Sequence, residues 1–211
     1  MDLLLSPPEV RVLASLVEKE ITTPEYYPLS LNALINACNQ KSNRDPVVNY
    51  DEETVENTLE ALRHKGLITT VTGAGSRVPK YGHRISEQLN LGRRELAILC
   101  ELMLRGAQTL GELRGRTERL HKFDDSSEVE SVIDHMPELI VKLARRPGEK
   151  EARYAHKLYG QLPVPEETEA AEPPTPARQD RIAMLENELA ALREDVEALK
   201  QQFAQFRRQF E

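Results

Sequence analysis

The feature that most constrains this chain is a unit that occurs twice. Residues 51–85 have the pattern of a helix closed by a glycine, a β-branched strand, a turn and a second strand. Residues 127–158 have the same succession. The two second strands, at 80–85 and 153–158, share the order basic, Tyr, small, His, basic, aliphatic. We therefore predict an internal repeat of helix, strand, turn and strand.

Two further helical patterns precede the repeated unit in each copy. Ser6 and Ser30 stand where helix caps are expected in the first copy, and Thr109 stands at such a position in the second. Ser127 and Glu130 are spaced as a capping box for the last helix of the second copy. The order helix, helix, helix, strand, turn, strand is that of a winged helix, a helix-turn-helix with a β-hairpin attached.

The pattern divides the chain into four segments. We predict a mainly α fold with small β wings (α+β), built from two tandem winged-helix domains at 1–88 and 89–160. Prolines and glutamates with almost no apolar side chains make 161–178 a stiff, solvated linker. A coiled-coil helix is predicted at 179–211.

The last segment has apolar residues spaced alternately by three and four, which is the a/d seam of a coiled coil. In a parallel pair, Glu188 would face Arg193, and Asp195 would face Lys200. We predict a homodimer through this seam; the alternative is one amphipathic helix folded back on the chain's own domains. The seam residues are Ile182, Leu185, Leu189, Leu192, Val196, Leu199, Phe203, Phe206 and Phe210.

The net charge, the length of the apolar runs and the cysteines exclude several classes of protein. A net charge of −7 is not the basic balance of a protein that holds DNA by phosphate neutralisation alone. No apolar run approaches the ~20 residues of a membrane span, and Asp2 stands where a signal peptide would be basic. Cys38 and Cys100 lie in apolar helical patterns, so we expect reduced core residues of a cytoplasmic protein.

Three stretches resemble the bacterial YceH family: PEYYPLSLNAL at 24–34, ACNQKSNRDPV at 37–47 and KYGHR at 80–84. The resemblance covers essentially residues 1–160. It implies two winged-helix domains followed by a coiled coil. It implies no particular activity, ligand or catalytic residue.

A polar surface follows the second predicted helix and the loop after it. Amides and basic groups together can bond phosphates and base edges of a nucleic acid. The alternative is a solvated face in which some amides cap the loop. The candidate contact residues are Asn36, Asn39, Gln40, Lys41, Asn43 and Arg44.

Both predicted third helices are acidic, so we expect neither to enter a DNA groove, because carboxylates repel phosphates. Basic residues lie instead on or beside the two predicted hairpins, which favours contacts led by the wings. Ordinary solvated strand faces are the alternative. The candidate wing residues are Arg77, Lys80, Arg84, Arg145, Arg146, Lys150 and Arg153.

No motif for catalysis or for a cofactor is evident. His83 and His156 lack a second ligand at metal spacing, and we expect both to be structural. We therefore expect a non-enzymatic protein that needs neither a metal nor a cofactor.

Two functions remain. The first is a regulator-like protein, dimeric and bound to nucleic acid through its wings, which predicts salt-sensitive retention on DNA. The second is a protein–protein adaptor whose acidic helices dock on a basic partner. The adaptor hypothesis predicts a partner that is lost on charge reversal at Glu52, Glu53 and Glu56.

Overall fold

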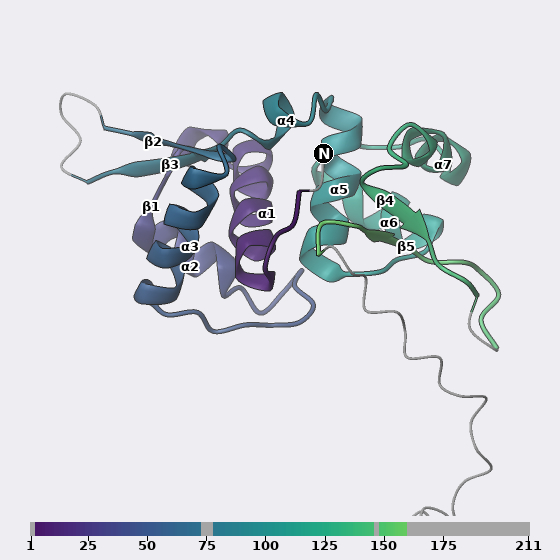
Figure 1. The fold of residues 1–211 in the computed structure, drawn as a ribbon. Helices are drawn as coiled ribbons and strands as arrows, with labels where there is room; N and C mark the ends of the chain where they lie inside the picture. The colour runs from purple at the N-terminus through teal and green to yellow at the C-terminus, as the bar shows by residue number, and fades with distance from the viewer. Residues whose placement is uncertain (1–2, 73–77, 146–147, 160–211) are drawn as a thin grey trace, which may run out of the picture. The chain divides into compact units, whose positions relative to one another are not determined.

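The described part of the chain, residues 3–72, 78–145 and 148–159 of a computed structural model, is about half helical and carries two small antiparallel sheets (Figure 1). The fold is therefore α+β, in agreement with the prediction of helices with small β elements. The chain divides into two units, Met1–Leu162 and Pro163–Glu211, and all described residues belong to the first. The predicted linker and the dimer seam from Ile182 to Phe210 lie outside the described residues.

The first half of the unit begins as its sequence predicts. Ser6 forms a capping box with Glu9, and Ser30 and Asp51 cap the next two long helices. Gly66, with φ of 70°, ends the third of them. The elements are α1 (Pro7–Thr22), η1 (Pro24–Tyr26), β1 (Leu29–Ser30), α2 (Leu31–Cys38), α3 (Glu52–His64), β2 (Ile68–Val71), β3 (Lys80–His83) and α4 (Ile85–Gln88).

Three short elements of this half, η1, β1 and α4, are absent from the sequence prediction. The short strand β1 adds to the hairpin, giving a sheet in the order β1-β3-β2. Ile85, expected to close the second strand, instead begins α4, where it is fully buried. The strand ends at His83, two residues earlier than predicted: the Arg84 N–H donates to the Leu67 carbonyl at 2.7 Å, and the chain then turns into α4.

The second half repeats this order with shorter helices. Thr109 forms a capping box with Glu112, as predicted for the cap. The predicted box at Ser127 is wrong: Asp125 is the cap and accepts from the Glu128 N–H, since an Asp caps as well as a Ser. The elements are α5 (Arg93–Arg105), α6 (Leu110–Arg116), η2 (Thr117–Arg119), α7 (Ser126–Asp134), β4 (Ile140–Lys142) and β5 (Tyr154–His156).

The two hairpins have the same register, which confirms the predicted repeat. In each, the His pairs with the Ile that opens the first strand, and the Tyr pairs with the residue two positions later. A backbone hydrogen bond of 2.7 Å then closes each ladder, from Arg84 to Leu67 and from Lys157 to Leu139. The cross-strand pairs are Ile68 with His83, Thr70 with Tyr81, Ile140 with His156 and Lys142 with Tyr154.

The equivalence extends to the residue before the second helix of each half. Leu29 pairs with Tyr81 through β1. Gln108 forms a bridge with Tyr154 in the second half, with backbone hydrogen bonds of 3.0 and 2.7 Å. The third strand of the first sheet is thus reduced to one residue pair in the second.

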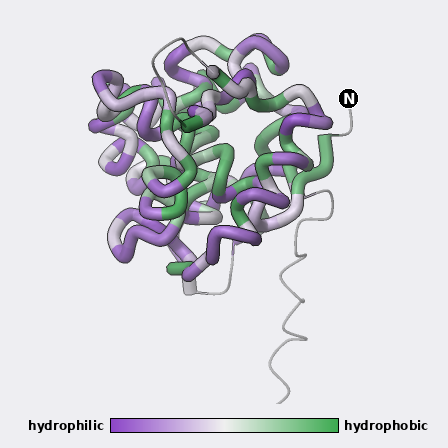
Figure 2. The backbone as a smooth tube through the Cα atoms, turned by 90° about the vertical axis from the view of Figure 1, so that its left-hand side faces the viewer, coloured by the Kyte–Doolittle hydropathy of each residue, from purple (hydrophilic) through white to green (hydrophobic). Residues whose placement is uncertain are grey.

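The two halves share one core. α1 packs against α2, α3 and α5, and its residues Leu13 and Leu16 lie in the same buried cluster as Leu99 and Leu104 of α5. A smaller cluster fills the space between α5, α7 and the second hairpin. The hydrophobic stretches accordingly gather in the interior, with hydrophilic ones mostly at the periphery (Figure 2).

Both cysteines are buried and free, as predicted. Burial raises the pKa of the Cys38 thiol to about 11, and the Cys100 thiol donates to the Ala14 carbonyl at 3.4 Å. They are therefore packing residues between helices. Of the helices described, none has the length and apolar character needed to cross a membrane.

Candidate functional site

Arg44, a predicted contact residue, is buried and engaged within the protein. Its Nη2 lies 2.6 Å from Glu18 Oε2 on α1, and its guanidinium also donates to the Ala37 and Asn43 carbonyls. A buried arginine needs such partners, because an unpaired charge inside a protein is costly. Arg44 therefore ties the loop after α2 to α1 and presents no free guanidinium to solvent.

Two of the predicted amides have similar structural roles. Asn39 accepts from the Tyr50 N–H and donates to the Tyr50 carbonyl, each at 2.8 Å, which closes the loop between α2 and α3. Asn43 adopts a φ of 59° and accepts a hydrogen bond from Arg105 of α5. Asn39 thus has the loop-capping role of the alternative, whereas Asn43 links the loop to α5.

Other members of this polar surface remain accessible. Asn36 and Lys41 are exposed, and Gln40 is half-buried. Of the six candidate contact residues on this surface, a ligand could therefore reach Asn36, Lys41 and part of Gln40.

The candidate wing residues are dispersed. Arg77 and Arg146 lie outside the described residues. Lys80 is half-buried in β3, and the exposed Arg84 forms an ion pair with Glu87 at 3.0 Å. The first hairpin therefore presents little unpaired positive charge in its described part.

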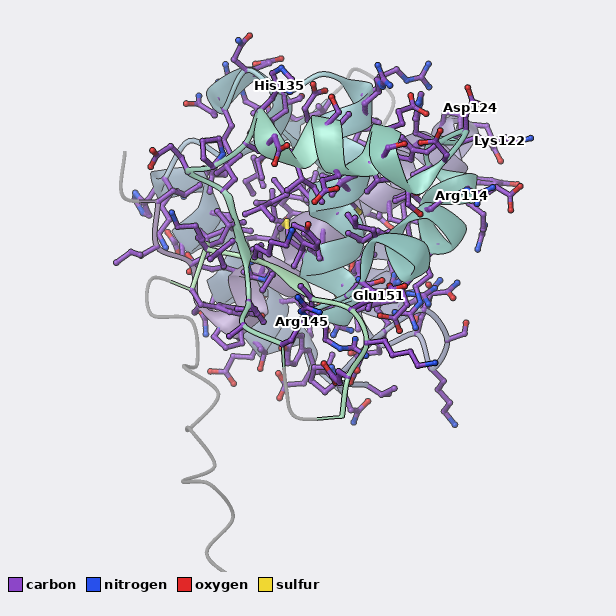
Figure 3. All side chains as sticks on the ribbon, turned by 90° about the vertical axis from the view of Figure 1, so that its right-hand side faces the viewer. Arg114, Lys122, Asp124, His135, Arg145 and Glu151 are labelled. Carbon is purple, nitrogen blue, oxygen red and sulfur yellow. The ribbon has the colours of Figure 1, made fainter. Side chains whose placement is uncertain are left out.

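The bases of the second half are interspersed with acids. Arg153 donates to Glu112 at 2.9 Å and to the Ala107 carbonyl at 3.1 Å, so it is tied to α6. Arg145 and Lys150 are exposed. In Figure 3, Arg145 lies well away from Arg114, and a second ion pair joins Arg153 to Glu149 at 3.6 Å.

The exposed faces of the two third helices are acidic, as predicted. On α3, Glu60 is paired with Arg63 at 3.3 Å. Glu56 has neither a hydrogen bond nor an ion pair within the part of the chain that the structure describes. The exposed carboxylates of this helix are Glu52, Glu53, Glu56 and Glu60.

A groove of about 310 Å³ runs between α3 and the first hairpin. Apolar side chains form part of it, and a tyrosine and two glutamates are among the polar groups that line it. The lining residues are Glu56, Leu59, Glu60, Arg63, Ile68, Thr70, Pro79 and Tyr81.

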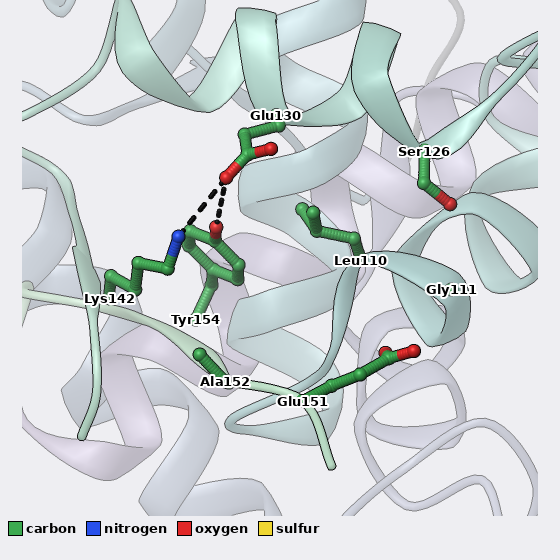
Figure 4. A pocket seen from close by; sticks show the side chains of 8 residues that line it. All are labelled: Leu110, Gly111, Ser126, Glu130, Lys142, Glu151, Ala152 and Tyr154. Atoms are coloured by element: carbon green, nitrogen blue, oxygen red, sulfur yellow. Dashed lines mark hydrogen bonds and ion pairs between the residues drawn. The ribbon is translucent and has the colours of Figure 1, made fainter. Parts of the chain in front are cut away.

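An equivalent groove of about 230 Å³ lies between α7 and the second hairpin, and also reaches α6 (Figure 4). Lys142 Nζ lies 3.1 Å from Glu130 Oε1 and 5.3 Å from the centre of the Tyr154 ring. The Tyr154 hydroxyl donates to the same carboxylate oxygen at 2.9 Å. These hydrogen bonds lower the pKa of Glu130, since they favour its charged form.

Three lining positions correspond between the grooves. Glu56 and Glu130 each follow a fully buried valine of the third helix. Tyr81 and Tyr154 are equivalent in the hairpin register, and Thr70 therefore stands where the second copy has Lys142. The grooves share a glutamate and a tyrosine and differ in the residue between them.

The two histidines of the hairpins, His83 and His156, are buried. His83 Nε2 lies 2.7 Å from Glu20 Oε2, and the His83 N–H donates to the Tyr27 hydroxyl at 2.6 Å. His156 Nδ1 accepts from the Leu158 N–H at 3.3 Å, and burial lowers the pKa of His156 to about 4. No cluster of three or more His, Cys, Asp or Glu suited to a metal occurs among the described residues.

A buried polar network between α5 and α6 has no counterpart in the sequence prediction. Glu101 forms an ion pair with Arg105 at 3.2 Å, and burial raises the pKa of Glu101 to about 7. Gln108, fully buried, donates to the Glu101 carbonyl and accepts from Arg116 at 2.9 Å. The i,i+4 spacing of Glu101 and Arg105 on an apolar helix was the available signal.

The fold and its grooves define a duplicated α+β protein. The model of the family described as "Protein of unknown function, DUF480" matches residues 5–149. A UPF0502 protein of Solibacter usitatus is 55% identical over 214 residues, and one of Geobacter sulfurreducens is 51% identical over 221; each alignment covers 100% of both chains. This chain belongs to the DUF480/UPF0502 family.

Proposed function

We propose that this chain is a non-enzymatic adaptor that docks a basic segment of another protein on its acidic third-helix surface. The observation that carries the proposal is Glu56, an exposed carboxylate at a groove and without a partner among the described residues. A cation on the docked segment would gain an ion pair there. Phosphates would meet repulsion from the same helix.

The proposal includes the finer architecture that the sequence predicts. Two tandem winged-helix domains, similar to those of the YceH family, would be held as a cytoplasmic homodimer by the coiled coil at 179–211. The order α1-α2-α3-β2-β3, repeated as α5-α6-α7-β4-β5, supports the winged-helix assignment. A dimer would present each groove twice and strengthen binding to a repeated or dimeric partner.

Charge reversal tests the adaptor. The triple variant E52K/E53K/E56K is expected to lose a partner that wild-type protein captures by cross-linking in its own cells. The matched control E25K/E118K/E138K reverses three other exposed glutamates and is expected to keep that partner. Equal capture by both triple variants, or no partner common to wild type and control, would contradict the proposal.

Nucleic-acid binding led by the hairpins is the second candidate. It is favoured by Arg145 and Lys150, exposed bases beside the second hairpin. Titration with duplex DNA at several salt concentrations tests it. Each lost phosphate contact in R145A or K150A should lower the salt slope by about one, and an unchanged slope would count against wing contacts.

A further inference from the structure

The second groove shows how this scaffold holds a cation. Lys142 extends from β4 so that its ammonium group lies on the Glu130 carboxylate and near the Tyr154 ring (Figure 4). The tyrosine hydroxyl hydrogen-bonds to the same oxygen and so orients the carboxylate. An ion pair and a cation–π contact thus act on one ammonium group.

The first groove has the same two acceptors, but the residue equivalent to Lys142 is uncharged. Thr70 occupies the position of Lys142, and its hydroxyl carries no charge. Arg63, the one base that lines this groove among the described residues, pairs with Glu60 of its own helix. Glu56 is left with no described partner, and Tyr81 has no described hydrogen bond from its hydroxyl.

The remaining lining suits the stem of a lysine side chain. Leu59 and Ile68 are buried apolar residues, and Pro79 adds an exposed apolar edge. The methylene groups of a lysine can lie along such a surface while its ammonium group stays at the polar end.

We propose that the first groove binds a lysine side chain of a partner protein between Glu56 and the Tyr81 ring, as the second groove binds Lys142. The proposal rests on the adaptor function and names the group that the adaptor recognises. Lys142 occupies the second groove, whereas no described residue forms an ion pair with Glu56 in the first. A single lysine contact of this kind is weak, and it selects among segments that other contacts hold.

The chain offers a self-blocking variant as a test. T70K places the internal cation of the second copy into the first and is expected to fill the groove. T69K is the matched control, because neighbouring residues of a strand point to opposite faces of the sheet and Thr69 is also exposed. Both variants add one positive charge to β2.

The probe is Nα-acetyl-lysine methylamide, titrated to millimolar concentration against full-length protein with NMR detection of the tyrosine rings. Wild type and T69K should show saturable shifts of the Tyr81 ring, with the Tyr154 ring unchanged. T70K and E56Q should bind about tenfold more weakly or not at all. Equal binding by T70K and wild type, equal binding of the uncharged norleucine analogue, or no shift in wild type would overturn the proposal.

The partner captured by wild-type protein separates the two proposals. If E52K/E53K/E56K loses this partner while T70K and T69K keep it equally, the adaptor function stands and the lysine site is wrong. If T70K loses this partner while T69K keeps it, both proposals stand. If the triple reversal keeps it, the adaptor function itself fails.

Discussion

The two halves of the molecule share a backbone plan but differ in the side chains that complete it. Their hairpins pair in the same register, and Leu29 and Gln108 bridge to equivalent tyrosines. Leu29 is an apolar core residue, whereas Gln108 is a fully buried amide bonded to Arg116. Main-chain hydrogen bonds depend little on side-chain type, so a duplicated fold can keep its ladders while its polar contacts diverge.

The buried difference follows a simple rule. A buried polar group needs a partner, so Gln108 comes with Arg116, whereas the equivalent Leu29 needs none. The exposed difference between Lys142 and Thr70 is of another kind, because the carboxylate is present in both copies, as Glu130 and Glu56.

The largest expected loss of stability comes from mutation in the loop that follows the second helix of each half. The first copy holds its loop with the buried pair Glu18–Arg44, whereas the bases Arg119 and Lys122 of the second copy are exposed. Arg44→Ala should lower the free energy of unfolding by about 3 kcal/mol, because the buried Glu18 carboxylate then keeps only Lys19, at 3.4 Å, as a partner. Arg119→Ala should change it by less than about 0.5 kcal/mol. Urea denaturation of both variants measures the difference, and equal small losses would show that the pair is not needed.

The histidines should differ in how they respond to acid. Burial lowers the pKa of His156 to about 4, below an unfolded value of about 6.5. The stability it contributes is present above pH 6.5 and is lost as pH falls through 4, by about 3 kcal/mol. Glu20 partly opposes the same shift in His83. NMR titration of both rings, with denaturation of His156→Leu from pH 7 to 4.5, tests this; an unchanged acid dependence in the variant would contradict it.

Glu101 should act in the opposite direction. Burial raises its pKa to about 7 in the folded state, so the folded protein holds a proton that the unfolded chain releases above about pH 4.5. Its ionisation therefore costs stability progressively as pH rises from 4.5 to 7. Glu101→Gln should match wild type near pH 4.5 and exceed its unfolding free energy by about 2–3 kcal/mol at pH 8. An advantage that does not grow with pH would rule out this account.

Exchanging the residues at the β1 position sharpens the comparison further. Gln108→Leu, which copies Leu29, should cost about 1–3 kcal/mol, because the Arg116 guanidinium loses its buried acceptor. Adding Arg116→Met should recover part of the loss, since both polar partners are then gone. A double-mutant cycle in urea gives the coupling energy, and strict additivity would mean that the two residues act independently.

The smallest effect on stability is expected at the grooves. Lys142→Thr copies Thr70 into the second half and removes only an exposed ion pair, so its thermal midpoint should match that of wild type within error. The same change should open the second groove to the lysine probe. Saturable shifts of the Tyr154 ring in this variant, absent from wild type, provide the measurement.

The sequence predicts the local features of this fold well. Caps at Ser6, Ser30 and Thr109 and the glycine ending of α3 depend on neighbouring residues, and the structure has them as predicted. The repeat was visible because the Tyr and His positions sit in the same ladder register.

The non-local features escaped prediction. Arg44 lies in a polar loop, so its sequence context predicts an exposed side chain. Its partner Glu18 lies on a helix 26 residues earlier. The groove around Lys142 joins residues from α7, β4 and β5, which no short sequence pattern brings together. The β1 strand of two residues is too short to give an alternating pattern.

The bond between Leu5 N–H and the Leu158 carbonyl, 2.7 Å long, links the opening of the fold to its close. The two ends of the chain segment 5–158 are therefore adjacent in space. A chain whose ends are adjacent can be joined there and opened elsewhere without a change in the packing of its helices and strands. A circular permutant that joins these ends through a short glycine-rich bridge and reopens the chain within 73–77 should fold, with both copies still sharing α1 and α5 as their common wall.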